Sequence, residues 1–171
     1  MKQLLLVFSL LLAQHSFAQS PETRLKEMGI SLSAPSAPVA NYVKYVRTGN
    51  LIFLSGHGPE DKTKGGYITG KVGKELGIEE GYAAARLTGI SLLSTLKAAV
   101  GDLSKVKRIV KVLGMVNGTE NFTDQPKVIN GFSDLMVAVF GDVGKHARSA
   151  VGMASLPMNM AVEIEMVVEV D

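Results

Sequence analysis

The chain has 171 residues, a formal net charge of +2 and no cysteine. The absence of cysteine excludes disulfides, thiol nucleophiles and cysteine metal sites. The charge is close to neutral, no basic run is present and only 6% of the residues are aromatic, which argues against a nucleic-acid-binding surface.

Residues 1–18 have the pattern of a signal peptide. Lys2 gives a positive start, residues 4–13 form an apolar run too short to span a bilayer, and Ser16 and Ala18 are the small residues of a cleavage site. We therefore expect cleavage after Ala18 and a periplasmic or secreted protein. No second hydrophobic span follows, so we expect no membrane contact after cleavage.

The first half of the remaining chain predicts a helix, a hairpin and a loop. A short helix is expected over residues 20–30, with Ser20 as its N-cap. Residues 42–47 and 51–56 have strand patterns and are separated by a turn, which predicts a β-hairpin. Residues 57–77 are rich in glycine and lysine and predict a mobile loop.

The second half alternates helices and strands. Helical patterns cover residues 78–100 and 125–140, and a strand pattern covers residues 106–116. Two further strands are predicted over residues 148–155 and 162–170. The order β-β-α-β-α-β-β predicts an α+β fold, with a single mixed β-sheet and two helices packed on one face. The opposite sheet face would stay bare and partly apolar, so we expect an oligomer.

The last two predicted strands carry the residues of greatest chemical interest. With a period of two, Arg148 shares a face with Ala150, Gly152 and Ala154. In the second strand Glu163 and Glu165 point away from the apolar face. If these two strands are adjacent, Arg148 and Glu163 could hold a small carboxylate and activate a water molecule. The alternative is a surface ion pair on an edge strand.

Several motifs in the same order resemble the RidA/YjgF family, which is also known as the endoribonuclease L-PSP or chorismate mutase-like group. Its closing signature is similar to ARSAVGMASLPMNMAVEIE, and its strand ending in Ser-Gly is similar to GNLIFLSG, with Ser55 and Gly56. Tyr42 lies thirteen residues before that serine, and Asn130 opens the second helix in VINGFSDL. The resemblance runs from about Asn41 to the C-terminus, and is strongest to the longer, less characterised branch.

The resemblance implies a homotrimer with clefts between subunits and no cofactor or metal. It implies an enamine/imine deaminase, a hydrolase that converts 2-imino acids into 2-keto acids and ammonia. Arg148 would bind the substrate carboxylate, and Glu163 would position or deprotonate the water. The residues expected to shape the pocket and donate or accept hydrogen bonds are Tyr42, Ser55, Gly56 and Asn130.

The resemblance also sets the domain boundaries and reveals departures from the family pattern. Residues 19–40 are an N-terminal extension, and residues 41–171 are the RidA-like domain. Ala150 stands where the family often has cysteine, which imine hydrolysis does not require. His146 stands where proline is common and could change the charge of the cleft. His57, directly after Ser-Gly, is a further candidate for the cleft wall.

Two other functions stay open. One is a non-catalytic trimeric protein that binds small carboxylates, because an exported member would not meet the intracellular pool of enamines. The other is an endoribonuclease, although the chain offers no histidine pair for general acid–base catalysis.

Overall fold

The computed structural model describes residues 19–38, 40–61 and 63–171. The predicted signal peptide, residues 1–18, lies outside the described residues, so its cleavage and the export of the protein stay predictions. Within the described ranges, no helix is both long and apolar enough to cross a membrane.

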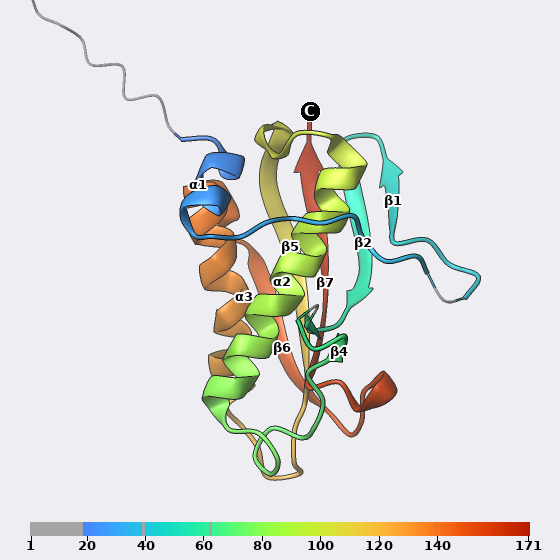
Figure 1. Cartoon of the computed structure of the whole chain (residues 1–171), viewed down its shortest axis with the longest axis vertical. Coiled ribbons are helices and arrows are strands. Elements are labelled where there is room, and N and C mark those ends of the chain that lie inside the picture. Colours follow the sequence, from blue (N-terminus) through green and yellow to red (C-terminus); the bar gives the residue numbers. More distant parts are fainter. Residues whose placement is uncertain (1–18, 39, 62) are drawn as a thin grey trace, which may run out of the picture.

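Five strands form the main sheet in the order β1-β2-β7-β5-β6 (Figure 1). Their bounds are Tyr45–Thr48 (β1), Leu51–His57 (β2), Val106–Asn117 (β5), Ala147–Met153 (β6) and Val162–Val170 (β7). β5 and β6 are parallel, whereas all other neighbours are antiparallel. The last two strands are not adjacent, because β5 lies between them, so the condition for placing Arg148 and Glu163 on neighbouring strands is not met. A helical crossover brings β6 parallel to one edge of β5, which leaves the other edge for β7.

Two long helices cover one face of this sheet (Figure 1). They are α2, Ile78–Val100, and α3, Gln125–Phe140. The predicted α+β fold, with a mixed sheet and both helices on one face, is therefore confirmed. The buried residues of α3 include Val128, Phe132, Leu135, Met136 and Val139, which recur at the three- and four-residue spacing of one helix face. In β7 the alternate residues from Val162 to Val170 are buried, as the period of two predicted.

Small residues allow α2 and α3 to approach closely. A Cβ atom at Gly131 would overlap the backbone carbonyl oxygen of Tyr82, and a Cβ at Gly89 would lie 2.9 Å from Leu135. Glycine is therefore required at Gly131, because backbone cannot move aside as a flexible side chain can. This contact fixes the position of α3, which carries the predicted site residue Asn130.

The segment expected to be a mobile loop contains structure. Its two short strands, β3 (Glu60–Asp61) and β4 (Gly66–Tyr67), pair with each other. Val72 is fully buried, and its backbone N–H donates to the carbonyl of Asn117 at 2.8 Å. The segment is poor in large apolar residues, as the sequence indicates, but these long-range contacts hold it to the sheet.

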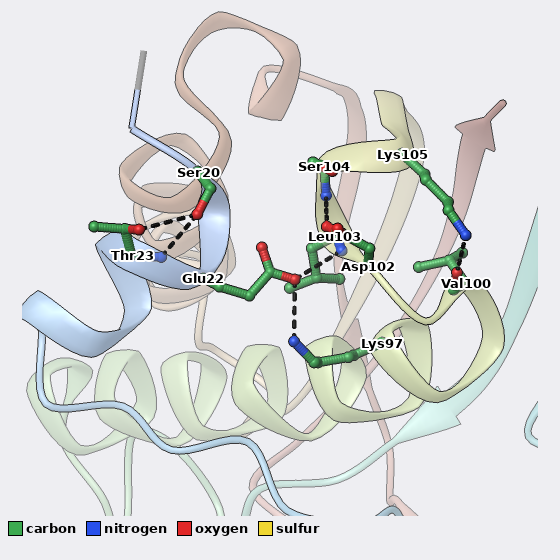
Figure 2. A network of polar contacts seen from close by, with 9 residues as sticks. All are labelled: Ser20, Glu22, Thr23, Lys97, Val100, Asp102, Leu103, Ser104 and Lys105. Carbon is green, nitrogen blue, oxygen red and sulfur yellow. Dashed lines mark hydrogen bonds and ion pairs between the residues drawn. The ribbon is translucent and has the colours of Figure 1, made fainter. Parts of the chain in front are cut away.

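The N-terminal helix α1, Pro21–Glu27, is held by a carboxylate that joins three elements (Figure 2). Ser20 is its N-cap, as predicted, and accepts a hydrogen bond from the Thr23 N–H at 3.2 Å. Glu22 Oε1 accepts from Lys97 Nζ on α2 at 3.0 Å and from the backbone N–H of Leu103 at 2.8 Å. Leu103 begins a 3₁₀ turn, η1, that leads into β5. The 3₁₀ turns are η1 (Leu103–Lys105), η2 (Gly141–Gly144) and η3 (Pro157–Asn159).

We predict that Glu22→Ala lowers the free energy of unfolding by about 1–3 kcal/mol, because it removes a charged acceptor shared by two donors. Chemical denaturation at one fixed protein concentration measures the loss. Glu120→Ala is the matched control, since Glu120 is exposed and accepts none of the hydrogen bonds described here. Equal stability of the two variants would contradict the role of Glu22.

Candidate active site

Most of the predicted site residues lie in two separate regions of the structure. One region is a cavity of about 510 Å³ at the end of β2, lined in part by Tyr42, Gly56 and Glu163, which we call the β2 cavity. The other lies where α3 meets β6 and contains Arg148 and Asn130, which we call the Arg148 cluster. Ser55 belongs to neither region, although it lies next to the β2 cavity along the chain.

The β2 cavity forms beside a bulge in β2. The register with β7 runs from Leu54 opposite Met166 to His57 opposite Ile164, so β2 carries one extra residue here. Ser55 stabilises the bulge, because its hydroxyl donates to the carbonyl of Val43 at 2.7 Å. The strand predicted to start at residue 42 begins only at Tyr45. The residues before Tyr45 lie opposite the bulge, where the regular hydrogen-bond ladder is interrupted.

Glu163 points toward this bulge from the neighbouring strand. A Cβ atom at Gly56 would overlap the Glu163 carboxylate, so the glycine leaves the space that the carboxylate occupies. Burial, together with the negative charge of Glu165, raises the pKa of Glu163. A carboxylate with a raised pKa is a stronger base than an ordinary glutamate, which suits acid–base chemistry.

His57 supports the wall of the β2 cavity in its neutral form. Its Nδ1 lies 2.7 Å from the carbonyl oxygen of Ser55, which can only accept, so Nδ1 carries the proton. Its Nε2 therefore accepts from the hydroxyl of Thr95 on α2 at 2.8 Å. Burial is the main reason that the pKa of His57 falls from 6.5 to about 4. The sequence indicated His57 as a candidate for the cleft wall but not Thr95, whose side chain is buried on α2.

We predict that the protein loses stability on acidification because of His57. Between pH 6.5 and about 4 the unfolded chain binds a proton at this residue that the folded protein does not, so stability falls as the pH falls. The slope from one such group is at most about 1.4 kcal/mol per pH unit, or on the order of 3 kcal/mol in total. Urea unfolding at fixed protein concentration from pH 4 to 7 measures it, and His57→Gln should flatten the profile. A variant profile as steep as that of the wild type would refute the prediction.

In the Arg148 cluster, the guanidinium of Arg148 donates hydrogen bonds to two uncharged side chains. Arg148 Nη1 donates to Asn130 Oδ1 at 2.9 Å and to Ser133 Oγ at 2.9 Å. Asn130 and Ser133 lie three residues apart on α3, so both face β6. Within the described ranges, Arg148 forms no ion pair with a carboxylate, and its Nε and Nη2 take no hydrogen-bond partner. The surface ion pair considered from the sequence is therefore not formed among the described residues.

This geometry suits the binding of an anion. Nε and Nη2 form one side of the planar guanidinium, and two parallel N–H groups match the two oxygens of a carboxylate. Sequence reasoning missed Ser133, although its spacing from Asn130 places a second polar residue on the same side of an otherwise apolar helix.

Arg148 and Glu163 point to opposite faces of the sheet. Arg148 is in register with Val112, which is buried beneath the helices and pairs with Met166 on β7. Glu163 pairs instead with Met115 and alternates with the buried residues of its strand. One chain therefore does not bring both side chains to one small ligand. A site that uses both needs a second chain.

The helix-free face of the sheet offers a surface for such contacts. Val46 and Phe53 are 55% and 44% exposed there, and β6 adds the exposed side chains of Val151 and Met153. Exposed apolar side chains on one continuous sheet face are typical of subunit interfaces.

Comparisons with known proteins identify the class of protein to which this fold and these two regions belong. Residues 22–170 match the sequence profile of the family described as "YjgF/chorismate_mutase-like, putative endoribonuclease". The chain belongs to this family, the RidA/YjgF family.

Three similar proteins illustrate the relationship. Protein TCP17 of Trypanosoma cruzi is 47% identical over 148 residues, which cover 86% of this chain and 92% of that protein. The crystal structure of Atu1372 from Agrobacterium tumefaciens, a protein of unknown function, has a TM-score of 0.82 and 44% identity, covering 88% of this chain and 92% of that one. A 2-iminobutanoate/2-iminopropanoate deaminase of Dermatophagoides farinae is 26% identical over 142 residues, covering 82% of this chain and 95% of that protein.

Proposed function

We propose that the protein is an enamine/imine deaminase that hydrolyses 2-imino acids to 2-keto acids and ammonia. The observation that carries the proposal is the Arg148 guanidinium, which is held by two neutral acceptors while its Nε and Nη2 take no partner in the described part of the chain. The deaminase of Dermatophagoides farinae, a more distant relative, supports the choice of reaction.

We further propose that the active site forms between subunits of a homotrimer. Arg148 and Glu163 lie on opposite faces of the sheet in one chain, so a shared ligand needs Arg148 of one subunit and Glu163 of the next. The exposed apolar side chains of the helix-free face support burial against other copies.

In the proposed reaction, Arg148 fixes the substrate by its carboxylate through two parallel hydrogen bonds. Glu163 accepts a proton from a water molecule, whose oxygen attacks the imine carbon and forms a carbon–oxygen bond. The proton passes to the nitrogen and gives a carbinolamine. A second proton then moves from its hydroxyl group to the amino nitrogen through Glu163, the carbon–nitrogen bond breaks as the carbonyl forms, and ammonia leaves a 2-keto acid. The raised pKa of Glu163 supports its use as the base that returns the proton.

A second candidate is a protein that binds small carboxylates without catalysis. The separation of Arg148 from Glu163 within one chain favours it, because the Arg148 cluster alone can hold an anion. Failure of the purified protein to hydrolyse 2-iminobutanoate, together with binding of 2-oxobutanoate, would support this candidate over the deaminase.

We predict that Arg148→Lys and Arg148→Ala each lower the affinity for 2-oxobutanoate and kcat/KM about ten- to a hundredfold. Lysine keeps the charge but loses the two-pronged geometry, and a charge-assisted hydrogen bond contributes about 1.5–3 kcal/mol. Calorimetry measures binding, and hydrolysis of 2-iminobutanoate made in situ by an amino-acid oxidase measures turnover.

Arg108→Lys is the matched control, because Arg108 is an exposed arginine on β5. Light scattering of every variant should give three times the mass of one chain. Full activity of Arg148→Ala would show that the arginine has no part in the reaction. Dissociation of that variant into monomers would show that Arg148 stabilises the interface instead.

We predict that Glu163→Gln lowers kcat by about 10²–10⁴-fold and leaves the affinity for 2-oxobutanoate nearly unchanged. The amide keeps the shape of the side chain but cannot accept the proton of water. Glu165→Gln is the control and should retain turnover. It should also shift the acidic limb of the pH–rate profile to lower pH, because it removes a negative charge that raises the pKa of Glu163. Unchanged kcat in Glu163→Gln would exclude Glu163 as the base.

A further inference from the structure

A chain of hydrogen bonds continues from Arg148 beyond Ser133 to His146. His146 Nδ1 lies 2.7 Å from the carbonyl oxygen of Gly144, so Nδ1 must donate. In a neutral imidazole the other nitrogen, Nε2, then accepts, and its neighbour at 3.1 Å is the hydroxyl of Ser133. The serine proton therefore points to His146, which leaves a lone pair of Ser133 Oγ for Arg148 Nη1 at 2.9 Å.

The His146 end of this series of hydrogen bonds is rigid. Gly144 closes the turn η2 and is buried, and a Cβ atom there would overlap the backbone carbonyl of Met136 on α3. The ring of His146 also packs against Phe132, with the centroids 5.8 Å apart and the planes at 71°. The imidazole therefore has one orientation, fixed by α3 and η2.

We propose that His146 is a positioning residue for Arg148, acting through the hydroxyl of Ser133. This inference rests on the proposed role of Arg148 as the carboxylate anchor. His146 takes the proton of Ser133 and so directs the serine lone pair at Nη1, which turns Nε and Nη2 toward the ligand. His146 itself touches no substrate.

The charges around His146 favour the neutral imidazole that this role requires. Burial lowers the pKa of His146, the hydrogen bond to Gly144 opposes it, and the positive charge of Arg148 on β6 adds to the lowering. The two nearby carboxylates already have other partners. Asp142 of η2 pairs with Lys145 at 2.8 Å, and Asp134 of α3 accepts from the Tyr82 hydroxyl at 2.9 Å. The expectation that His146 changes the charge of the cleft is thus replaced by a role as an uncharged acceptor near neutral pH.

The test compares variants of the full-length protein by calorimetric binding of 2-oxobutanoate at pH 7.5. His146→Leu removes the acceptor for Ser133 and should weaken binding about two- to tenfold, and Ser133→Ala should weaken it to a similar extent. His146→Gln can present an amide oxygen where Nε2 lies and should restore most of the affinity. The double variant of Ser133 and His146 should lose no more affinity for 2-oxobutanoate than either single variant, because both residues act through one series of hydrogen bonds.

The effect must also pass through Arg148. In an Arg148→Ala background, His146→Leu should cause no further loss of binding, whereas an equal loss would show a general structural effect and overturn the proposal. Asp142→Asn, which breaks the exposed ion pair of the same turn, is the control and should bind like the wild type. Undiminished affinity in both His146→Leu and Ser133→Ala would also overturn it.

An NMR readout separates this inference from the proposed function. In protein labelled at arginine with ¹⁵N, the Nε–H signal of Arg148, assigned by its loss in Arg148→Ala, should become mobile in His146→Leu and remain rigid in His146→Gln. A rigid signal in His146→Leu contradicts the positioning role. Absence of any 2-oxobutanoate binding by the wild type contradicts the proposed function instead, and the NMR result still decides the role of His146.

Discussion

The position of β5 between β6 and β7 is the constraint on which the candidate site depends. Because β5 separates the two strands, Arg148 lies at the sheet edge, where α3 can reach it. Glu163 lies on an inner strand and points away from the helices. Alternation along each strand sets the two faces, with the arginine under the helices and the carboxylate on the helix-free face, and the strand order sets how far apart the two side chains lie.

This arrangement separates the proposed carboxylate anchor from the proposed base within one chain. Asn130 and Ser133 come from a helix that cannot shift, since Gly131 lies against the backbone of α2. Glu163 depends instead on the bulge of β2, where Gly56 gives it room. Each half of the proposed site has its own support, and in the proposed function a second chain brings the halves together.

The sequence predicted the faces of the elements better than their neighbours. Hydrophobic period alone gives the buried residues of α3 and of β7, because it follows from helix and strand geometry. It does not give the strand order, since alternation shows which side chains share a face and not which strand pairs with which. The β2 bulge and the contacts of Val72 with Asn117 are long-range, so no local pattern indicates them. The strand pattern alone indicated Arg148 as a candidate, the resemblance gave it a role and added Asn130, and Ser133 and the orientation of His146 needed the structure.

The hydrogen bonds of Arg148 to Asn130 and Ser133 also affect when its conformational freedom is lost. A free arginine side chain carries about 2 kcal/mol of rotamer entropy, which a ligand normally has to overcome when it binds. Here the side chain is already ordered by folding, so its entropy is lost before any ligand arrives. A small carboxylate, which has few atoms with which to offset such a cost, can therefore be bound by a preorganised arginine with little further loss of disorder in the protein.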